Sequence, residues 1–287
     1  MKTLKSKKLD QPKLKVSRVE KIPFCIFMSA LGFVLFSFVL IYLVDLRNFL
    51  GSRDLLYSLD QSAFRFHVRP FMFFHLYREG GVAENLQWLF LGATAVISAF
   101  IAGSMYNRER IVFCFWIVMA VAFTLMLIED AGNPRHTLRG YVQAVFSETE
   151  RGMIGTMAEG IYFTILAAIP VYAFWHYRKP VMADRRSAGY LLTGFIGYGS
   201  AAALSFTGTG LGTYLWLGGK VRSAMLFLAD DETAGQWLYY EKQAGGPFFH
   251  VMLMDWMVEE SIELMAAAAF CASAVAFLLY VRRTYGL

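Results

Sequence analysis

The stretch IVFCFWIVMAVAFTLMLIED, residues 111–130, decides the fold class. It is apolar throughout, apart from one threonine, until it ends in two acids. A run of about 20 apolar residues is long enough to cross a bilayer core roughly 30 Å thick. Five further runs of this kind predict an all-α integral membrane protein with six transmembrane helices. The predicted spans cover residues 23–45, 86–105, 111–129, 154–176, 189–213 and 255–281.

The composition agrees with a membrane protein. Hydrophobic residues make up 57% of the 287 residues and charged residues 17%, against roughly 25% charged residues in soluble domains. Residues 1–22 form a basic, polar tail, and residues 23–287 form one membrane domain. The apolar run after the tail is longer than the core of a signal peptide and is followed by no small-residue cleavage site, which predicts an uncleaved first span.

Lysine and arginine set the orientation. With a cytoplasmic N-terminus, the tail and the short inner segments 106–110, 177–188 and 282–287 carry 16 of the 27 basic residues. This distribution satisfies the positive-inside rule and predicts a multi-pass protein of the cytoplasmic (inner) membrane with both termini in the cytoplasm. The net charge of +5 is therefore a topology signal, and we expect no nucleic-acid partner.

Acidic side chains gather at one predicted depth. Counting about 20 residues outward from each cytoplasmic helix end places carboxylates of four spans at the outer boundary. These carboxylates belong to Glu84, to Glu129 and Asp130, to Glu159, and to Glu263. The outer segments, helical or irregular, are expected to form a cap over this layer.

The last span opens with MDWMVEESIELMAAAAF, residues 254–270, which holds four carboxylates. On an α-helix Asp255, Glu259 and Glu263 recur every four residues and form one stripe, while Glu260 points about 100° away. Like charges at this spacing repel each other. The stripe therefore requires a neutralising partner.

Three kinds of partner are open: arginines, a divalent cation and protons. The arginines near the outer boundary are Arg78, Arg135, Arg139 and Arg151. Carboxylate oxygens suit Mg²⁺, Ca²⁺ or Mn²⁺, and added imidazole suits Zn²⁺ or Fe²⁺. The candidate metal ligands are Glu84, Glu129, Asp130, Glu159, Glu259, Glu263, His136 and His250.

The leading hypothesis is an outward-facing cation site with metal-dependent chemistry on lipid headgroups. A divalent cation would polarise a phosphoryl or carbonyl oxygen or activate water, and a crowded glutamate would act as general base. Glu259 and Glu263 are the candidate catalytic residues. The alternatives are a non-catalytic subunit of a membrane complex and a cation- or proton-coupled carrier. The expected partners are membrane lipids and other membrane subunits.

The segment YREGGVAENLQWLFLGATA, residues 77–95, resembles a pattern found in uncharacterised multi-pass bacterial membrane proteins. In that pattern an acidic-Gly pair and a glutamate precede one span, an acidic pair ends the next, and a Glu-Glu-x-x-Glu stretch opens the last. The matching residues here are Glu79, Gly80 and Glu84, then Glu129 and Asp130, then Glu259, Glu260 and Glu263. The chain has AGNPRHTLRG where those proteins show a Trp-Gly-Gln-Arg stretch. The resemblance implies a shared acidic layer and no particular activity.

Overall fold

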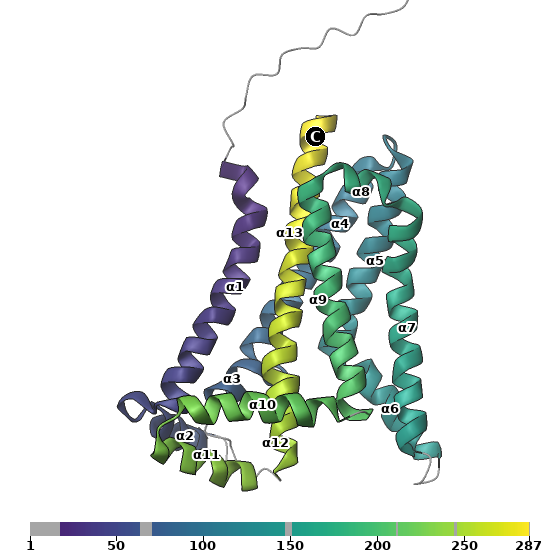
Figure 1. Ribbon diagram of the computed structural model, residues 1–287. Coiled ribbons are helices and arrows are strands. Elements are labelled where there is room, and N and C mark those ends of the chain that lie inside the picture. The colour runs from purple at the N-terminus through teal and green to yellow at the C-terminus, as the bar shows by residue number, and fades with distance from the viewer. Residues whose placement is uncertain (1–17, 64–70, 147–150, 211, 244–245, 287) are drawn as a thin grey trace, which may run out of the picture.

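The computed structural model describes residues 18–63, 71–146, 151–210, 212–243 and 246–286 (Figure 1). Within these ranges all regular structure is helical and no strand occurs. Most of the predicted basic tail, residues 1–17, lies outside the described residues. The predicted all-α class is confirmed for the described part of the chain.

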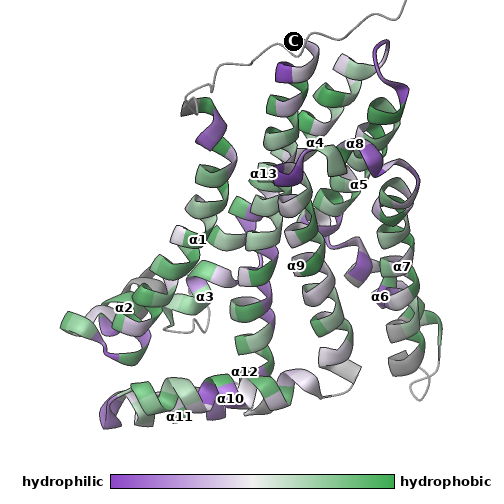
Figure 2. Ribbon diagram, turned by 45° about the horizontal axis from the view of Figure 1, so that its top comes forward, coloured by the Kyte–Doolittle hydropathy of each residue, from purple (hydrophilic) through white to green (hydrophobic). Residues whose placement is uncertain are grey.

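Five segments are long and apolar enough to cross a membrane, and they coincide with five of the six predicted spans. Long helices stand side by side in Figure 1, and Figure 2 shows hydrophobic residues along them and hydrophilic residues in the connections. The helices of these segments are α1 (Ile22–Ile41), α4 (Val82–Met105), α5 (Arg110–Gly132), α7 (Arg151–Tyr177) and α13 (Glu260–Tyr285).

A sixth long helix, α9 (Arg185–Gly210), covers the remaining predicted span but is richer in glycine and serine than the other five. It lies against α13, where glycine permits close approach. A Cβ atom at Gly197 would lie 2.7 Å from the Ala266 Cβ, and one at Gly194 would overlap the Phe270 ring. α9 therefore packs as an integral part of the bundle.

Helix α13 is the centre of the bundle. Its residues from Ala266 to Ala274 are almost entirely buried, and all of them are small except Phe270. Phe270 lies 4.9 Å from Phe123 of α5 between ring centroids, and Phe277 lies 4.9 Å from Trp116. Rings on α13 thus pack directly against rings of α5 in the core.

Short helices gather at one end of the bundle (Figure 1). One of them, α10, runs across the bundle axis and passes very close to the segment that contains His250. A Cβ atom at Gly218 of α10 would overlap the carbonyl of His250, so only glycine fits there. These short helices are α2 (Ser52–Ala63), α3 (Met72–Tyr77), α6 (Pro134–Val145), α10 (Thr213–Leu228), α11 (Asp231–Gln243) and α12 (Pro247–Met252).

The remaining helical pieces are single turns or π-helical segments. At the opposite end α8 (Lys179–Ala183) connects α7 with α9, and η1 (Arg18–Lys21) precedes α1. Two π-helical segments, η2 (Tyr42–Leu46) and η4 (Leu253–Glu259), extend α1 and precede α13. A 3₁₀ turn, η3 (Phe49–Gly51), leads into α2.

Asp45 in η2 ties α1 to the short helices. Its side chain is fully buried, and its two carboxylate oxygens accept the backbone N–H groups of Met72 (2.6 Å) and Phe73 (3.0 Å) at the start of α3. Its backbone carbonyl accepts Trp237 Nε1 of α11 at 2.8 Å and Arg53 Nη1 at 3.3 Å. The carboxylate thus caps α3, whose first N–H groups have no partner within the helix.

Candidate carboxylate site

Gln87 of α4 joins the acids of two other helices. Its side chain is 1% exposed, and its Nε2 atom donates to Asp130 Oδ2 of α5 and, at 2.9 Å, to Glu263 Oε2 of α13. The same atom lies 3.1 Å from the hydroxyl of Tyr198 on α9, which donates to Asp130 Oδ2 at 3.4 Å. One amide therefore bridges two carboxylates at the meeting point of four helices.

Further acids surround this bridge. Glu84 acts electrostatically on Asp130, Glu260 and Glu263, and Glu259 acts on Glu260. We call Glu84, Asp130, Glu259, Glu260 and Glu263, together with Gln87 and Tyr198, the carboxylate cluster. The acids of three predicted spans thus converge at one end of the bundle.

The start of α4 explains part of the Glu-Gly-Gly pattern. Gly80 has a φ of +70°, which favours glycine, and a Cβ atom on Gly81 would lie 2.6 Å from the Arg78 carbonyl. This tight turn directs the Gly80 N–H to Glu84 Oε2. Glu84 therefore has a local structural partner as well as a place in the carboxylate cluster.

Arg135 brings positive charge to the cluster. Asn133, at a φ of 46°, and Pro134 end α5 and start α6, which turns the chain back on itself. Arg135 Nε then lies 3.6 Å from Glu129 Oε1, and its Nη1 donates to Ser205 Oγ at 3.4 Å. Its charge also acts on Glu259 and Glu263. One guanidinium group thus serves acids on two helices.

Four buried oxygen atoms around the cluster have no hydrogen-bond partner within the described part of the chain. A buried polar atom without a partner is unfavourable by about 1–3 kcal/mol. Such a group of orphaned acceptors is the arrangement that a proton or a bound cation relieves. The atoms are Gln87 Oε1, Glu129 Oε2, Glu259 Oε2 and Glu260 Oε2.

The metal-ligand prediction stays a prediction. Among the described residues no three His, Cys, Asp or Glu side chains are placed closely enough to hold a metal ion between them. Instead the Gln87 amide occupies the space between Asp130 and Glu263. Its Oε1, an acceptor that hard cations bind, is nevertheless buried and unpartnered at this point.

Glu159 does not belong to the carboxylate cluster and pairs with an arginine instead. Arg139 Nη1 of α6 lies 3.3 Å from both carboxylate oxygens of Glu159 on α7. This pair joins two neighbouring helices, as the arginine alternative predicts. Of the other arginines considered, Arg78 lies over the Phe74 ring, and the Arg151 side chain lies outside the described residues.

His250 lies among the short helices. Its Nε2 is 3.3 Å from Glu241 Oε1, and Arg222 Nε donates to the other oxygen of that carboxylate at 2.6 Å. Glu241 of α11 thus connects α10 with α12. The His136 side chain, the other predicted imidazole ligand, lies outside the described residues.

The predicted stripe of Asp255, Glu259 and Glu263 assumed a continuous α-helix. Residues Leu253–Glu259 are π-helical instead, and a π-helix bonds residue i to i+5, so a four-residue spacing no longer keeps side chains in one line. Glu260, which the α-helical stripe leaves out, lies within electrostatic reach of Glu84, Asp130 and Glu263. The direction predicted for Glu260 relative to this stripe stays a prediction.

Gln87 and Tyr198 were not predicted as site residues. Gln87 follows Glu84 by three positions on α4, so the two share a helix face, and this spacing was the available signal. Tyr198 stands among the glycines of α9 and gave no comparable signal. Both are neutral side chains, and a search for charged groups passes over them.

No protein-family model matches the chain, and comparisons with curated proteins and with solved structures find no match either.

Proposed function

We propose that the protein binds an oxygen-preferring divalent cation, such as Mg²⁺, Mn²⁺ or Ca²⁺, in the carboxylate cluster. The observation that carries the proposal is the buried amide of Gln87, which bridges Asp130 and Glu263 while its own Oε1 has no partner in the described part of the chain. Several carboxylates around one amide concentrate more negative charge than Arg135 offsets. A bound cation neutralises this excess of negative charge, which apolar neighbours cannot do.

The amide supports an exchange between two states. Without a cation, the NH₂ group of Gln87 donates to Asp130 and Glu263 and holds them apart. With a cation between the carboxylates, the amide turns so that Oε1 becomes a ligand beside the oxygens of Asp130 and Glu263. This rotation of the amide points Oε1 of Gln87, in place of its NH₂ group, at the site, so that Oε1 gains the cation as a partner.

The site also suits a definite topology. We propose that α9 is the sixth span, which places the starts of α1 and α9 and the end of α13 on the cytoplasmic side of a bacterial-type inner membrane. The basic residues of the tail and the short inner segments favour this orientation. The carboxylate cluster and the short helices then face outward. Chemistry on lipid headgroups, with Glu259 and Glu263 as bases, would begin with cation binding at this outer face.

The test is the metal content of purified protein. Wild-type protein equilibrated with Mn²⁺ and desalted should retain about one ion per chain, and the double variant Glu259→Ala plus Glu263→Ala should retain far less. The control is Asp231→Ala plus Glu232→Ala, which removes two exposed carboxylates from α11. Equal retention by wild type and the cluster variant, or no retention by wild type, would refute the proposal.

A further inference from the structure

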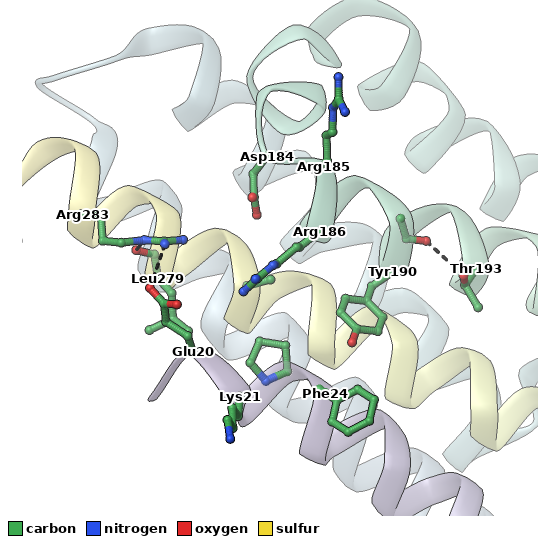
Figure 3. A pocket seen from close by; sticks show the side chains of 13 residues that line it. Glu20, Lys21, Phe24, Asp184, Arg185, Arg186, Tyr190, Thr193, Leu279 and Arg283 are labelled. Atoms are coloured by element: carbon green, nitrogen blue, oxygen red, sulfur yellow. Dashed lines mark hydrogen bonds and ion pairs between the residues drawn. The ribbon is translucent and has the colours of Figure 1, made fainter. Parts of the chain in front are cut away.

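A crevice opens at the other end of the bundle, between α1 and the pair α9 and α13. Its upper part is a cavity of about 700 Å³ lined by the starts of α1 and α9 and the last turns of α13 (Figure 3). Charged side chains from all three helices surround it: Glu20, Lys21, Asp184, Arg185, Arg186 and Arg283. This charged mouth lies at the opposite end of α13 from the carboxylate cluster and differs from the cluster in charge.

The two acids of the crevice already have partners. Glu20 Oε1 accepts Arg283 Nη1 at 2.9 Å, which joins α1 to α13. Asp184 Oδ2 accepts the backbone N–H of Ser187 at 3.2 Å and so caps the start of α9. In the described part of the chain the side chains of Lys21 and Arg186 make neither hydrogen bond nor ion pair. The four cations that line the crevice outnumber its two carboxylates, so its net charge is positive.

Arg186 is the cation aimed at the crevice. In Figure 3 its side chain extends from α9 into the space between α1 and α13, and its charge acts on Tyr190 one turn further along α9. The side chain of Arg185 points away from this space. A guanidinium group offers two parallel donors that match the oxygens of a phosphate group.

The crevice continues into an apolar cavity of about 300 Å³ further along α1. Thr193 lines both cavities, so they adjoin one another. The second cavity is walled by Phe27 and Val34 of α1 and by Met265 and Ala266 of α13. A positive mouth therefore leads directly into an apolar slot that runs along the long helices.

We propose that this crevice binds one anionic phospholipid, with its phosphate at Arg186 and an acyl chain in the slot between α1 and α13. Basic pockets between membrane helices are suited to anionic headgroups, and the adjoining slot gives the chain apolar contacts that a free anion does not use. Such a lipid would connect α1, which contributes few buried residues, to the rest of the bundle. The proposal is independent of cation binding at the carboxylate cluster.

Native mass spectrometry of the detergent-solubilised full chain tests the proposal. Dioleoyl phosphatidylglycerol should bind with a stoichiometry of one, and dioleoyl phosphatidylcholine should bind at least about tenfold more weakly. Arg186→Gln should weaken phosphatidylglycerol binding by about tenfold, the size of a lost charge-assisted hydrogen bond, while Arg186→Lys should restore part of it. Arg185→Gln removes the same charge one residue away and should leave binding unchanged. Thr193→Phe, which fills the junction of the two cavities, should also weaken binding.

Four outcomes would overturn the proposal. Equal losses in Arg185→Gln and Arg186→Gln would indicate a diffuse surface charge. Equal binding of the two lipids would remove the role of the anionic headgroup. Inorganic phosphate competing at the affinity of phosphatidylglycerol, or full binding by Thr193→Phe, would show that no acyl chain occupies the slot. Size-exclusion profiles verify that each variant is folded before it is titrated.

Discussion

Asp45, which is buried, and Glu263, which is half-buried, are acids at the same end of the bundle, yet their surroundings differ. The two carboxylate oxygens of Asp45 each receive a backbone N–H group at the start of α3. Glu263 shares a single amide with Asp130 and lies within reach of several further acids. The comparison separates two uses of a carboxylate: Asp45 is supplied with donors by the fold, whereas the cluster has more acceptors than donors. Asp45, which has its own donors, holds structure, and we propose that the acids of the cluster, which lack donors, bind a cation.

The largest expected effect is on Asp45. Asp45→Ala leaves two N–H groups of α3 unpaired in a buried position and should lower the free energy of unfolding by about 3 kcal/mol. Unfolding by sodium dodecyl sulfate in mixed micelles measures the change. The matched control is Asp54→Ala in α2, an exposed acid whose removal should change stability by at most about 0.5 kcal/mol. Equal losses of stability in Asp45→Ala and Asp54→Ala would show that Asp45 has no special structural role.

Gln87→Leu tests the bridge of the cluster. Leucine keeps much of the volume but removes both donors between Asp130 and Glu263, so the free energy of unfolding should fall by about 2 kcal/mol when measured in a chelator. The variant should also lose the stabilisation that Mn²⁺ gives to wild type. If the variant is as stable as wild type and is still stabilised by Mn²⁺, Gln87 contributes neither to stability nor to cation binding.

Glu263→Gln should act with the opposite sign. It removes one negative charge from among like charges but keeps a hydrogen-bonding side chain, so in a chelator the protein should become more stable by about 1 kcal/mol. The equivalent change at Asp45, Asp45→Asn, should destabilise, because one oxygen acceptor is replaced by a donor. The two amide variants, unfolded under the same conditions, thus give the sharpest contrast. A fall in stability for both would mean that the cluster is a structural element like Asp45.

The smallest effect is expected at the pair of Arg139 and Glu159. Both side chains are partly exposed, and ion pairs of this kind contribute about 0.5 kcal/mol. Arg139→Ala should therefore shift unfolding only slightly and leave Mn²⁺ retention at the wild-type level. Loss of the ion in this variant would place Glu159 in the cation site after all.

The positions of the spans follow from the sequence because the hydropathy of a span is set by its own roughly 20 residues. It depends little on which other helices the span packs against. The predicted span 111–129 lies within α5, and 154–176 lies within α7. The convergence of Glu84, Asp130 and Glu263 also followed from a count of depth. Such a count ignores rotation about the helix axis, so it could not separate Asp130 from Glu129, which faces Arg135 instead.

What the sequence did not reveal depends on local geometry and on neutral partners. The π-helical segment Leu253–Glu259 interrupts the continuous α-helix that the predicted stripe assumed, and no residue type in that segment marks it. Gln87 and Tyr198 are brought to the acids by tertiary packing of α4 and α9. The count along the sequence assigns Glu159 a depth but not a partner. Its orientation toward Arg139 is set by the packing of α6 against α7.

The most direct test is a Mn²⁺ titration followed by electron paramagnetic resonance, carried out on wild type, Asp45→Asn and Glu263→Gln. Convergent carboxylates acting as one cation site predict about one bound ion per chain in wild type and in Asp45→Asn, with affinity at least about tenfold weaker in Glu263→Gln. Identical binding curves for wild type and Glu263→Gln would contradict it.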